Sequence, residues 1–309
     1  MTALRSRLSS AISSARSRPK FTPLLTIGYY RRIKPDLQTP VRRHRLGFIG
    51  AGKLAGSVIR GLLRAQFCAP GEIIAGEPND ELRRVVETET GIAVTTDNLE
   101  VAHSAETILI GVKPAVVLPV VREIAPVTEG RLIISLAAGT RLAAMESVAG
   151  GRFIRALTNT PSAICRGATG FARGTRTTDA DVSLARTIFG TIGIAVEVKE
   201  EQIDAVTALS GSGPAFVYAV IEALAAGGET CGLPADAAMI LAAQTVLGAA
   251  QLAIESGKSP EDLIKMVVTP GGTTAAGLAE MKKLKTSEGL IAAVEAATNR
   301  GREMAKEFS

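Results

Sequence analysis

The sequence predicts an α/β protein in which a doubly wound, mostly parallel sheet is followed by an all-helical region. Between residues 45 and 200, short apolar segments alternate with segments of helical periodicity, a pattern typical of parallel strands covered by helices on both faces. A glycine-rich turn joins the first apolar segment to the first helical one. Beyond residue 203 the chain is rich in alanine and shows no strand pattern. Two folded domains are therefore expected, 44–203 and 204–309.

The strands of the first domain are expected where short apolar runs are bounded by turn residues. In chain order they are 45–50, 72–77, 92–95, 107–112, 131–138, 152–157, 168–173 and 194–199. Apolar residues at helical spacing predict helices between some of them, at 53–66, 80–90, 116–124 and 179–189. The fourth strand is expected to stop at Lys113-Pro114, because proline cannot donate a backbone hydrogen bond within a sheet.

Glycine and proline residues divide the second domain into helices. The expected helices are 214–230, 234–256, 260–267, 274–284 and 288–308. They are rich in alanine and glycine and short of bulky core residues, so they bury enough surface only by packing closely against further helices. A partner subunit is therefore expected.

The composition excludes several classes of protein. Of the 309 residues, 46% are hydrophobic and 21% charged, which is too apolar for a disordered chain. With two histidines and three scattered cysteines, neither a metal centre nor a disulfide scaffold is expected. Aromatic residues make up 4%, few for a surface that stacks nucleic-acid bases. No uninterrupted apolar run of about 18 residues occurs, so no membrane span is expected.

The positive charge of the chain is concentrated near its start. Residues 1–45 carry a net charge of +10 and the remainder carries −5, so nucleic-acid binding by the folded body is not expected. Residues 1–43 are rich in Arg and Ser, poor in acids and without a continuous apolar core, which is typical of an organelle transit peptide. Mitochondrion and plastid both fit this composition. A basic tail on a cytoplasmic protein is the alternative.

The glycine-rich turn fits the pattern G-x-G-x-x-A between a strand and a helix, the fingerprint of a Rossmann-type dinucleotide-binding domain. Gly50 permits the tight turn, Gly52 lets the backbone approach a pyrophosphate, and Ala55 allows helix and sheet to pack closely. The free N–H groups of the helix N-terminus then face the phosphates. The sequence predicts a dinucleotide site with contacts from Gly50, Ala51, Gly52, Lys53, Leu54 and Ala55.

NADH or NADPH is the expected cofactor, and Glu77 favours NADH. Glu77 ends the second strand, where an acid accepts hydrogen bonds from the adenine ribose hydroxyls and repels a 2′-phosphate. A solvated turn residue is the alternative interpretation, and Arg83 and Arg84 are near enough in sequence to meet a 2′-phosphate instead. Lys113-Pro114 follows the fourth strand, and ligands bind beyond the C-terminal ends of parallel strands. This loop is therefore expected to flank the nicotinamide.

Two helix starts in the second domain combine small residues with hydroxyl groups, at 209–216 and at 270–277. Such a start binds a carboxylate through its free backbone N–H groups. Helix capping and close packing are the alternative explanation for the same residues.

Together these segments make the chain similar to the pyrroline-5-carboxylate reductase family, over residues 46–308. The matching pieces are F-I-G-A-G-K-L-A at 48–55, V-K-P at 112–114, A-A-G at 137–139, R-F-I-R-A-L-T-N-T-P at 152–161, D-A-V-T-A-L-S-G-S-G-P-A-F at 204–216 and P-G-G-T-T at 270–274. The last piece matches the signature region of the family.

The resemblance implies a helical substrate-binding and dimerisation domain after the Rossmann domain, and homodimers that assemble into decamers. It implies hydride transfer from NAD(P)H to the C=N bond of 1-pyrroline-5-carboxylate, which gives L-proline, the last step of proline biosynthesis. Thr274 would hydrogen-bond the ring nitrogen as the catalytic residue, and the carboxylate would be bound by Thr269, Gly272 and Thr273. Further cofactor contacts are implied for Asn98, Val112, Lys113, Pro114, Ala137, Ala138 and Gly139.

The chain departs from the family pattern at three places. They are Leu157-Thr158 before Asn159, Lys265-Met266 before the signature region, and Gly76-Glu77 at the end of the second strand. The third departure bears on the choice between NADH and NADPH, and none bears on the reaction.

Two other functions fit parts of the sequence. A related NAD(P)-dependent hydroxy-acid dehydrogenase or imine reductase is the first, and a hydroxy acid would need a base for its O–H proton, with Lys258 or Lys265 as candidates. His103 has no neighbour that resembles a catalytic pair and is expected to be structural. The second, a non-catalytic dinucleotide-binding sensor, would not need Thr269 and Thr274. A pyrroline imine is readily protonated by solvent, so a hydroxyl and helix-end N–H groups suffice to orient it.

Overall fold

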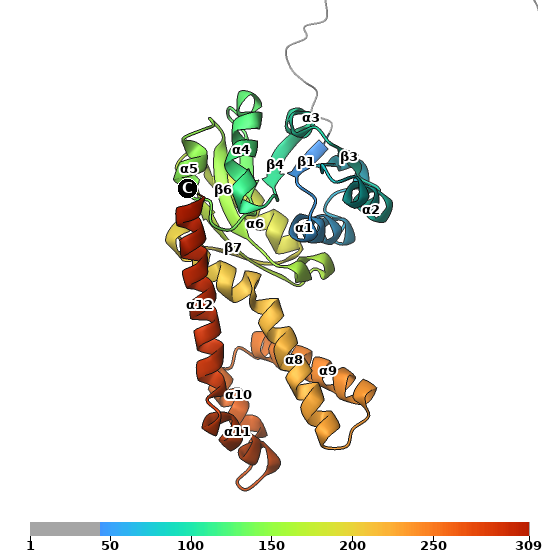
Figure 1. Cartoon of the computed structure of the whole chain (residues 1–309), viewed down its shortest axis with the longest axis vertical. Coiled ribbons are helices and arrows are strands. Elements are labelled where there is room, and N and C mark those ends of the chain that lie inside the picture. Colours follow the sequence, from blue (N-terminus) through green and yellow to red (C-terminus); the bar gives the residue numbers. More distant parts are fainter. Residues whose placement is uncertain (1–43, 309) are drawn as a thin grey trace, which may run out of the picture. The chain divides into compact units, whose positions relative to one another are not determined.

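An eight-stranded sheet forms the first part of the computed structural model, which describes residues 44–308 (Figure 1). In space the strands follow the order β3-β2-β1-β4-β5-β6-β7-β8. Every neighbouring pair is parallel except β6 with β7. The expected doubly wound sheet is confirmed, whereas the predicted leader, residues 1–43, lies outside the described residues. The strands are β1 (His44–Ile49), β2 (Ile73–Gly76), β3 (Ala93–Thr95), β4 (Ala105–Ile110), β5 (Leu132–Ser135), β6 (Arg152–Leu157), β7 (Gly167–Arg173) and β8 (Gly193–Glu197).

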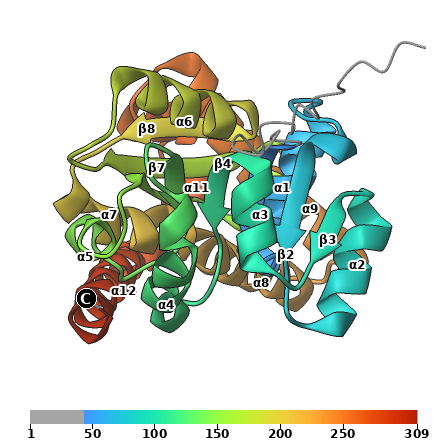
Figure 2. The same ribbon diagram turned by 90° about the horizontal axis from the view of Figure 1, so that it is seen from above.

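Helices cover both faces of the sheet (Figure 2). Successive residues of a strand point to opposite faces, so Leu109 of β4 enters one apolar core while Ile108 and Ile110 enter the other. This double burial explains why β4 reads as a continuous apolar run. The first core is closed by α1 (Lys53–Arg64), α2 (Asp80–Thr90) and α6 (Asp179–Thr191), and the second by α3 (Asn98–Ser104), α4 (Pro114–Ile124), α5 (Leu142–Glu146) and α7 (Ile203–Val206).

Local capping residues set the ends of the helices that the sequence predicts well. α2 begins after Asn79, whose side chain accepts a hydrogen bond from the Leu82 N–H at 2.8 Å, and it ends at Gly91 in the left-handed conformation. α6 begins after Thr178, which forms a capping box with Asp181. Both helices therefore begin at the predicted residues.

Two short helices, α3 and α5, are absent from the sequence prediction. α3 has seven residues and α5 has five, too few to show a full apolar period. α3 is nevertheless well defined at its start, because the Asp97 carboxylate accepts hydrogen bonds from the N–H groups of Leu99 and Glu100. This cap makes Asn98 the first residue of the helix.

The chain after β8 is helical, as expected. α7 continues into a π-helical turn, η5 (Thr207–Gly211), in which the Ser212 N–H donates to the Thr207 carbonyl at 2.8 Å. α7 and η5 contact the sheet and all described residues belong to one compact unit, so the predicted division at 203/204 stays a prediction. The later helices are α8 (Gly213–Thr230), α9 (Ala235–Ser256), α10 (Pro260–Val267), α11 (Thr273–Lys283) and α12 (Thr286–Glu307).

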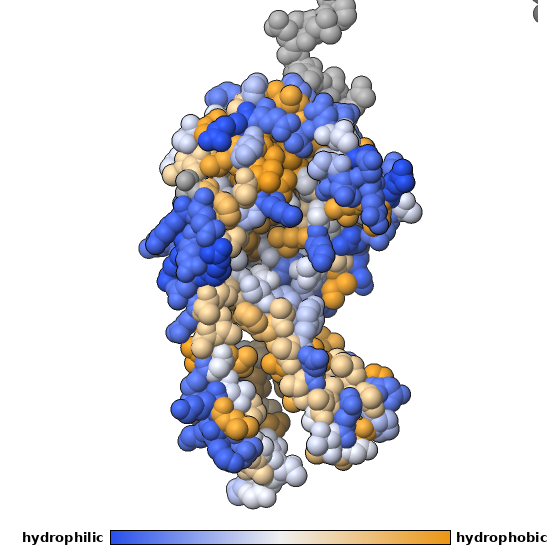
Figure 3. All heavy atoms as spheres, in the orientation of Figure 1, coloured by the Kyte–Doolittle hydropathy of each residue, from blue (hydrophilic) through white to orange (hydrophobic). Residues whose placement is uncertain are grey.

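The helices from α8 onward have almost no core of their own. α8 and α9 pack against each other, but the buried residues of this pair are three alanines, Ala225, Ala238 and Ala242. Among residues 44–308, 18 of the 23 exposed large apolar side chains belong to residues 200–308. Figure 3 shows apolar residues along these helices in its lower half. Exposed apolar surface on this scale marks an interaction surface.

Two helical stretches are long and apolar enough, on average, to cross a membrane. They are Glu200–Thr230 and Ala235–Ser256, with mean hydropathy 1.3 and 1.7. Neither stretch is an uninterrupted apolar run, which is why the sequence did not predict a membrane span there. Length and composition alone are weak evidence for a span, since helices buried between subunits meet the same criteria.

The last helix, α12, returns to the sheet (Figure 1). It contacts α7 and η5, and Gly301 lies against Asp204 so closely that an added Cβ would be 3.3 Å from the Asp204 Cβ. One turn further, Met304 packs on Gly139 in the loop after β5. The C-terminal end of α12 therefore touches the edge of the sheet at which parallel strands end.

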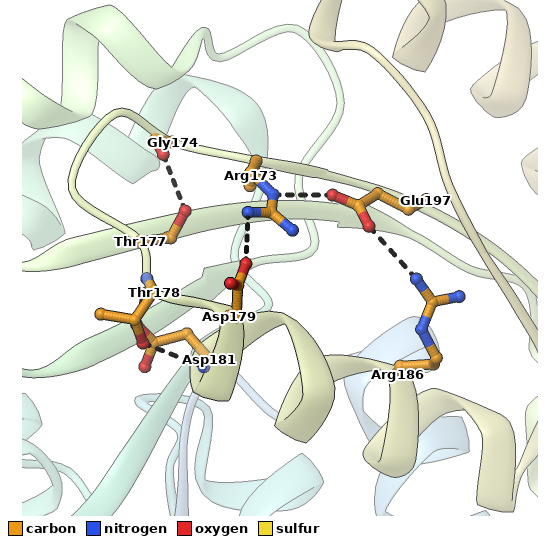
Figure 4. Close-up of polar contacts among 8 residues, drawn as sticks. All are labelled: Arg173, Gly174, Thr177, Thr178, Asp179, Asp181, Arg186 and Glu197. Atoms are coloured by element: carbon orange, nitrogen blue, oxygen red, sulfur yellow. Dashed lines mark hydrogen bonds and ion pairs between the residues drawn. The ribbon is translucent and has the colours of Figure 1, made fainter.

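At the outer edge of the sheet, arginine and acidic side chains tie β7, β8 and α6 together (Figure 4). Arg173 donates to Glu197 at 2.7 Å and to Asp179 at 3.0 Å, and Arg186 donates to the other oxygen of Glu197 at 3.2 Å. These groups are largely exposed, so each pair contributes little to stability.

Candidate functional site

The glycine turn between β1 and α1 has the backbone geometry that the sequence predicts. Gly50 has φ +87°, and an added Cβ would lie 2.8 Å from Val112 Cγ1 and 3.0 Å from the Gly111 carbonyl carbon. Only glycine fits this position. An added Cβ on Gly111 would in turn lie 2.6 Å from the Ala55 Cβ, so the turn, α1 and the end of β4 are in close contact.

The start of α1 is open to a ligand. Gly52 is the N-cap residue, no side chain caps the helix within the described part of the chain, and a Cβ on Gly52 would meet nothing within 4 Å. The first N–H groups of a helix have no partner inside the helix. The backbone of Lys53, Leu54 and Ala55 therefore presents donors to an anion, as a pyrophosphate requires.

Glu77 lies against this turn. Glu77 is only 7% exposed. One carboxylate oxygen accepts a hydrogen bond from the Ala51 N–H at 3.1 Å, and the other accepts one from the Asn79 N–H at 3.1 Å. The interpretation of Glu77 as a solvated turn residue is therefore wrong. Its carboxylate is fixed beside the turn, where the adenine ribose lies in this fold.

Arg83 lies close to the same place, whereas Arg84 is exposed. One guanidinium nitrogen of Arg83 donates to the Glu77 carbonyl at 3.0 Å, and another pairs with Asp80. A cavity of about 510 Å³ adjoins this region, between α1 and α2. It is lined by Ala51, Gly52, Lys53, Arg60, Leu82, Val85, Val86 and Glu89.

Two further strand ends adjoin the turn. β4 leads into Val112 and Lys113, and Lys113 is the N-cap residue of α4, with Pro114 in its first turn. Pro114 therefore begins a helix as well as ending the strand region. The Leu136 N–H donates to the Ile110 carbonyl at 2.9 Å, which places the loop with Ala137, Ala138 and Gly139 beside the end of β4. The strand order reverses between β1 and β4, where ligands bind in such sheets.

Asn98 lies behind the end of β2. A Cβ on Gly76 would lie 3.0 Å from the Asn98 Oδ1, and the Asn98 amide donates to Glu123 on α4 at 2.9 Å. The predicted cofactor residues are thus brought together along one edge of the sheet. They are Gly50–Ala55, Glu77, Asn98, Val112–Pro114 and Ala137–Gly139.

The predicted substrate residues lie in the turn between α10 and α11. Gly271 has φ +72°, and a Cβ on Gly272 would lie 2.3 Å from the Thr269 Oγ1, so the Thr269 hydroxyl closes over the start of α11. The Gly272 N–H already donates to the Thr269 carbonyl at 3.0 Å, so it is not free for a ligand. The N–H groups of Thr273 and Thr274 follow the N-cap residue and have no partner inside the helix.

Thr274 does not cap its helix. The N-cap residue of α11 is Gly272, and no side-chain capping bond is made there within the described residues. Thr274 is half-buried. The capping interpretation of its hydroxyl is therefore not supported, and the hydroxyl remains at a helix start that offers free N–H groups.

The two halves of the predicted site lie at opposite ends of α12. Met304 packs on Gly139, in the loop after β5 that holds predicted cofactor residues. α11 joins the other end of α12, which lies far from the sheet in Figure 1. From Thr286 to Met304 the helix spans about 27 Å at 1.5 Å per residue. Reacting atoms must approach to about 3–3.5 Å. α11, which carries Thr274 in its first turn, is thus joined to the end of α12 that lies away from the predicted cofactor residues.

The lysines that a hydroxy-acid dehydrogenase would need are not set in a catalytic environment. The Lys265 ammonium is exposed and pairs with Glu261 at 2.6 Å one turn away. Lys258 is exposed and contacts the Met266 sulfur. His103 is exposed in the last turn of α3. None of the three is enclosed with a second titratable partner that would tune it as a base.

A buried charge cluster beneath the cofactor loop was missed by the sequence analysis. Arg155 on β6 is fully buried and donates to Glu200 at 3.2 Å, while Asp204 lies 3.8 Å from it and pairs with Arg141 at 2.8 Å. Burial lowers the pKa of Arg155, and Glu200 opposes that shift. An arginine inside an apolar strand, R-F-I-R-A-L, is the one sequence signal for this cluster.

Two known families match separate parts of the chain. A family described as pyrroline-5-carboxylate reductase dimerisation matches residues 200–304. A family described as NADP oxidoreductase, coenzyme F420-dependent, matches residues 45–139. The first match covers the helices with exposed apolar faces, and the second covers the glycine turn and the loop that ends at Gly139.

Several whole proteins that resemble the chain are named pyrroline-5-carboxylate reductase. Pyrroline-5-carboxylate reductase of Pisum sativum is 42% identical over 263 residues, which are 84% of this chain and 96% of that protein. The enzyme of the same name from Glycine max is 40% identical over 267 residues, 86% and 97% of the two chains. The crystal structure of Plasmodium falciparum pyrroline carboxylate reductase with NADP bound has a TM-score of 0.78 at 28% identity, covering 86% of this chain and 99% of that one.

Proposed function

Because the chain belongs to the pyrroline-5-carboxylate reductase family, we propose that the cofactor edge of one subunit and α11 of its partner together reduce 1-pyrroline-5-carboxylate to L-proline. The chain is an NAD(P)H-dependent oxidoreductase that acts on a cyclic imine. The observation that carries this function is the match over nearly the whole length of the relatives, which includes both the glycine turn and the α10–α11 turn.

The start of α1 holds the dinucleotide. Backbone N–H groups from Lys53 to Ala55 bind the pyrophosphate, Gly52 leaves room for it, and Asn98 supports the ribose side. A bound NAD(P)H supplies the hydride that the imine carbon receives. The loops at Val112–Pro114 and Ala137–Gly139 line the nicotinamide side of the cleft, because both follow strands next to the point where the strand order reverses.

The α10–α11 turn holds the substrate. Free N–H groups of Thr273 and Thr274 and the Thr269 hydroxyl bind the carboxylate, and the closed turn at Gly272 keeps them aligned. The Thr274 hydroxyl hydrogen-bonds the ring nitrogen, which becomes charged when solvent protonates the imine. Orientation of the C=N bond against the dinucleotide is then the main contribution of the protein.

A homo-oligomer is required by this arrangement. The dimerisation family covers residues 200–304, and the apolar faces of α8 to α12 are the surfaces that a partner subunit covers. We assign the apolar stretches Glu200–Thr230 and Ala235–Ser256 to this interface and not to a membrane. By resemblance to the family, dimers assemble further into a decamer.

NADH is the proposed physiological cofactor, although the related crystal structure holds NADP. The fixed carboxylate of Glu77 would repel a 2′-phosphate and accept hydrogen bonds from ribose hydroxyls. Arg83 is already engaged with the Glu77 carbonyl and with Asp80, which leaves it less free to bind a phosphate.

The Arg- and Ser-rich composition of residues 1–43 supports an organelle, mitochondrion or plastid, as the site of action.

Turnover of the purified chain tests the function. Pyrroline-5-carboxylate should be reduced with oxidation of NADH and NADPH, and L-proline should form in equal amount. Hydroxy acids with the oxidised dinucleotides serve as the comparison. Oxidation of hydroxy acids without imine reduction would favour the dehydrogenase alternative, and absence of both activities would favour a binding protein.

A further inference from the structure

The loop after β5, Ala137–Arg141, is held in place by residues far away in the sequence. It leads into α5, whose first residue is Leu142, and Gly139 within it has φ +78°. Met304 of α12 backs the loop at Gly139, 3.1 Å from where a Cβ would be. Under the proposed function this loop borders the nicotinamide. The position of the loop therefore decides how the nicotinamide is oriented toward the imine carbon.

Glu200 anchors the chain where the loop ends. One carboxylate oxygen, Oε1, accepts a hydrogen bond from the Leu142 N–H at 2.6 Å and another from Arg155 Nη1 at 3.2 Å. Leu142 and Glu200 are 58 residues apart in the chain, so the bond joins α5 to the segment that leads into α7. A carboxylate that accepts from a backbone N–H and a guanidinium makes strong, charge-assisted bonds.

Arg155 holds Glu200 in this position. Its side chain is 0% exposed, and its Nε and Nη2 atoms make no hydrogen bond within residues 44–308. Asp204 is the other acid near it, at 3.8 Å, but the closer partner of Asp204 is Arg141, at 2.8 Å. Glu200 is therefore the one carboxylate in the described residues that accepts a hydrogen bond from Arg155. This bond fixes the Glu200 side chain and, through it, the end of the loop.

We propose that Glu200 is a positioning residue for hydride transfer, which it serves by fixing the loop Ala137–Arg141 against the nicotinamide side of the cleft. The inference rests on the proposed function, since that function places the nicotinamide beside this loop. The start of α1 binds the pyrophosphate independently of Glu200. Loss of the anchor should therefore lower kcat while the Kd of the dinucleotide changes little.

A matched set of variants tests the proposal in the full chain. Glu200→Ala removes both bonds, whereas Glu200→Gln keeps an oxygen that can accept from the Leu142 N–H. The control is Glu146→Ala. Glu146 is also half-buried and accepts a backbone N–H, that of Thr175, at 2.7 Å. It joins the end of α5 to the loop after β7, and because β7 runs antiparallel to β6 this loop lies at the edge of the sheet opposite the cleft.

We expect Glu200→Ala to lower kcat for pyrroline-5-carboxylate by about tenfold to a hundredfold, since misplacement by about 1 Å has effects of that size. Glu200→Gln should retain most of the kcat that Glu200→Ala loses. Glu146→Ala should lower the melting temperature without lowering kcat. A normal kcat in Glu200→Ala, or an equal loss in Glu146→Ala, overturns the proposal. If the unsubstituted chain does not reduce pyrroline-5-carboxylate, the proposed function fails instead.

A second pair of variants changes the donor of the same hydrogen bond, the Leu142 N–H, and serves if Glu200→Ala does not fold. Leu142→Pro removes the N–H at the first residue of α5, where proline is tolerated, and Arg141 before it has φ −78° and ψ 151°, which suit a residue preceding proline. Leu142→Ala shortens the side chain but keeps the N–H. Leu142→Pro should lower kcat at least about fivefold more than Leu142→Ala. Equal kcat values in the two variants would refute the role of the bond.

Discussion

The Glu77 carboxylate accepts a hydrogen bond from the Ala51 N–H at 3.1 Å, so the acid at the end of β2 is fixed on the glycine turn between β1 and α1. A negative charge held at this point is not free to turn away from a 2′-phosphate. The choice between NADH and NADPH should therefore depend on this one side chain more than on the nearby arginines.

Replacing Glu77 should change that choice. Glu77→Ser should raise the ratio of kcat/KM with NADPH to kcat/KM with NADH by about tenfold, because a repulsion of roughly 1.4 kcal/mol is removed. Glu77→Gln keeps an acceptor for the Ala51 N–H and isolates the effect of charge. Glu89→Gln, in the wall of the adjoining cavity between α1 and α2, is the control. An unchanged ratio in both Glu77 variants would show that Glu77 does not face the ribose.

Thr274 should matter for the imine and not for the dinucleotide. Thr274→Val keeps the shape but removes one hydrogen bond to a group that becomes charged, worth about 1.5–3 kcal/mol, or about 10- to 150-fold in kcat/KM for pyrroline-5-carboxylate. KM for the dinucleotide should barely change. Thr286→Val, a half-buried threonine at the start of the next helix, is the control. Normal turnover with a lowered melting temperature would leave Thr274 with a structural role only.

Mixed dimers should reveal that each site is shared between subunits. Gly52→Asp places a negative charge where the pyrophosphate binds, while aspartate still suits an N-cap position. Alone, Gly52→Asp chains should be nearly inactive, and Thr274→Val chains should show the loss of about 10- to 150-fold in kcat/KM given above. Co-expressed, they form dimers with one intact site if the cleft and α11 come from different subunits, so kcat/KM should recover in the mixed species. No recovery in isolated mixed dimers would place both halves of the site in one subunit.

The pair formed by Arg152 and Asp181 should make stability depend on pH. Burial alone would raise the pKa of Asp181, but hydrogen bonds from Arg152 and Thr178 outweigh it and the pKa is lowered. A lowered pKa gives stability that is present above the unfolded-state value, about 3.9, and is lost as the pH falls through the folded-state value. The difference in melting temperature between the unsubstituted chain and Asp181→Asn should therefore be constant from about pH 5 to pH 8 and shrink below about pH 4. Asp179→Asn, at an almost fully exposed carboxylate, should show little difference at any pH.

The leader should be dispensable for catalysis. A chain that begins at His44 should fold and reduce pyrroline-5-carboxylate with the kcat of the full chain, since β1 begins at that residue. A fluorescent fusion should lose organelle import when residues 1–43 are removed. Insolubility of the shortened chain would mean that these residues belong to the fold, and unchanged import would show that they carry no address.

The sequence predicts most of the elements because their signals are local. α2 and α10 match the predicted ranges, since capping side chains, Asn79 and Ser259, mark their starts. β4 is recognisable as an apolar run because both its faces are buried. α3 and α5 are too short for periodicity to be seen, and η5 arises where the chain packs on the sheet, which no local pattern specifies.

The site was predictable in its parts but not in its arrangement. The glycine turn and the α10–α11 turn each have a local pattern, and Glu77 follows a recognisable strand. The bond from Leu142 to Glu200 joins residues 58 positions apart, and neither residue has an unusual neighbour in sequence. The separation of the two turns along α12 is also a tertiary property, which no local pattern specifies.

The π-helical turn at Thr207–Gly211 sets the direction in which the interface helices point. Its wider ring accommodates one residue more than an α-helical turn would, and α8 begins directly after it. Deleting one residue here would return the segment to ordinary α-helical hydrogen bonding and leave the rotation of α8 about its axis nearly unchanged, because the wide turn already absorbs the extra residue. Deleting one residue within α8, where no wide turn absorbs the change, would rotate all that follows by about 100°. The apolar face of the rest of α8 would then point away from its partner. Single-residue deletions should therefore be better tolerated at Thr207–Gly211 than within α8.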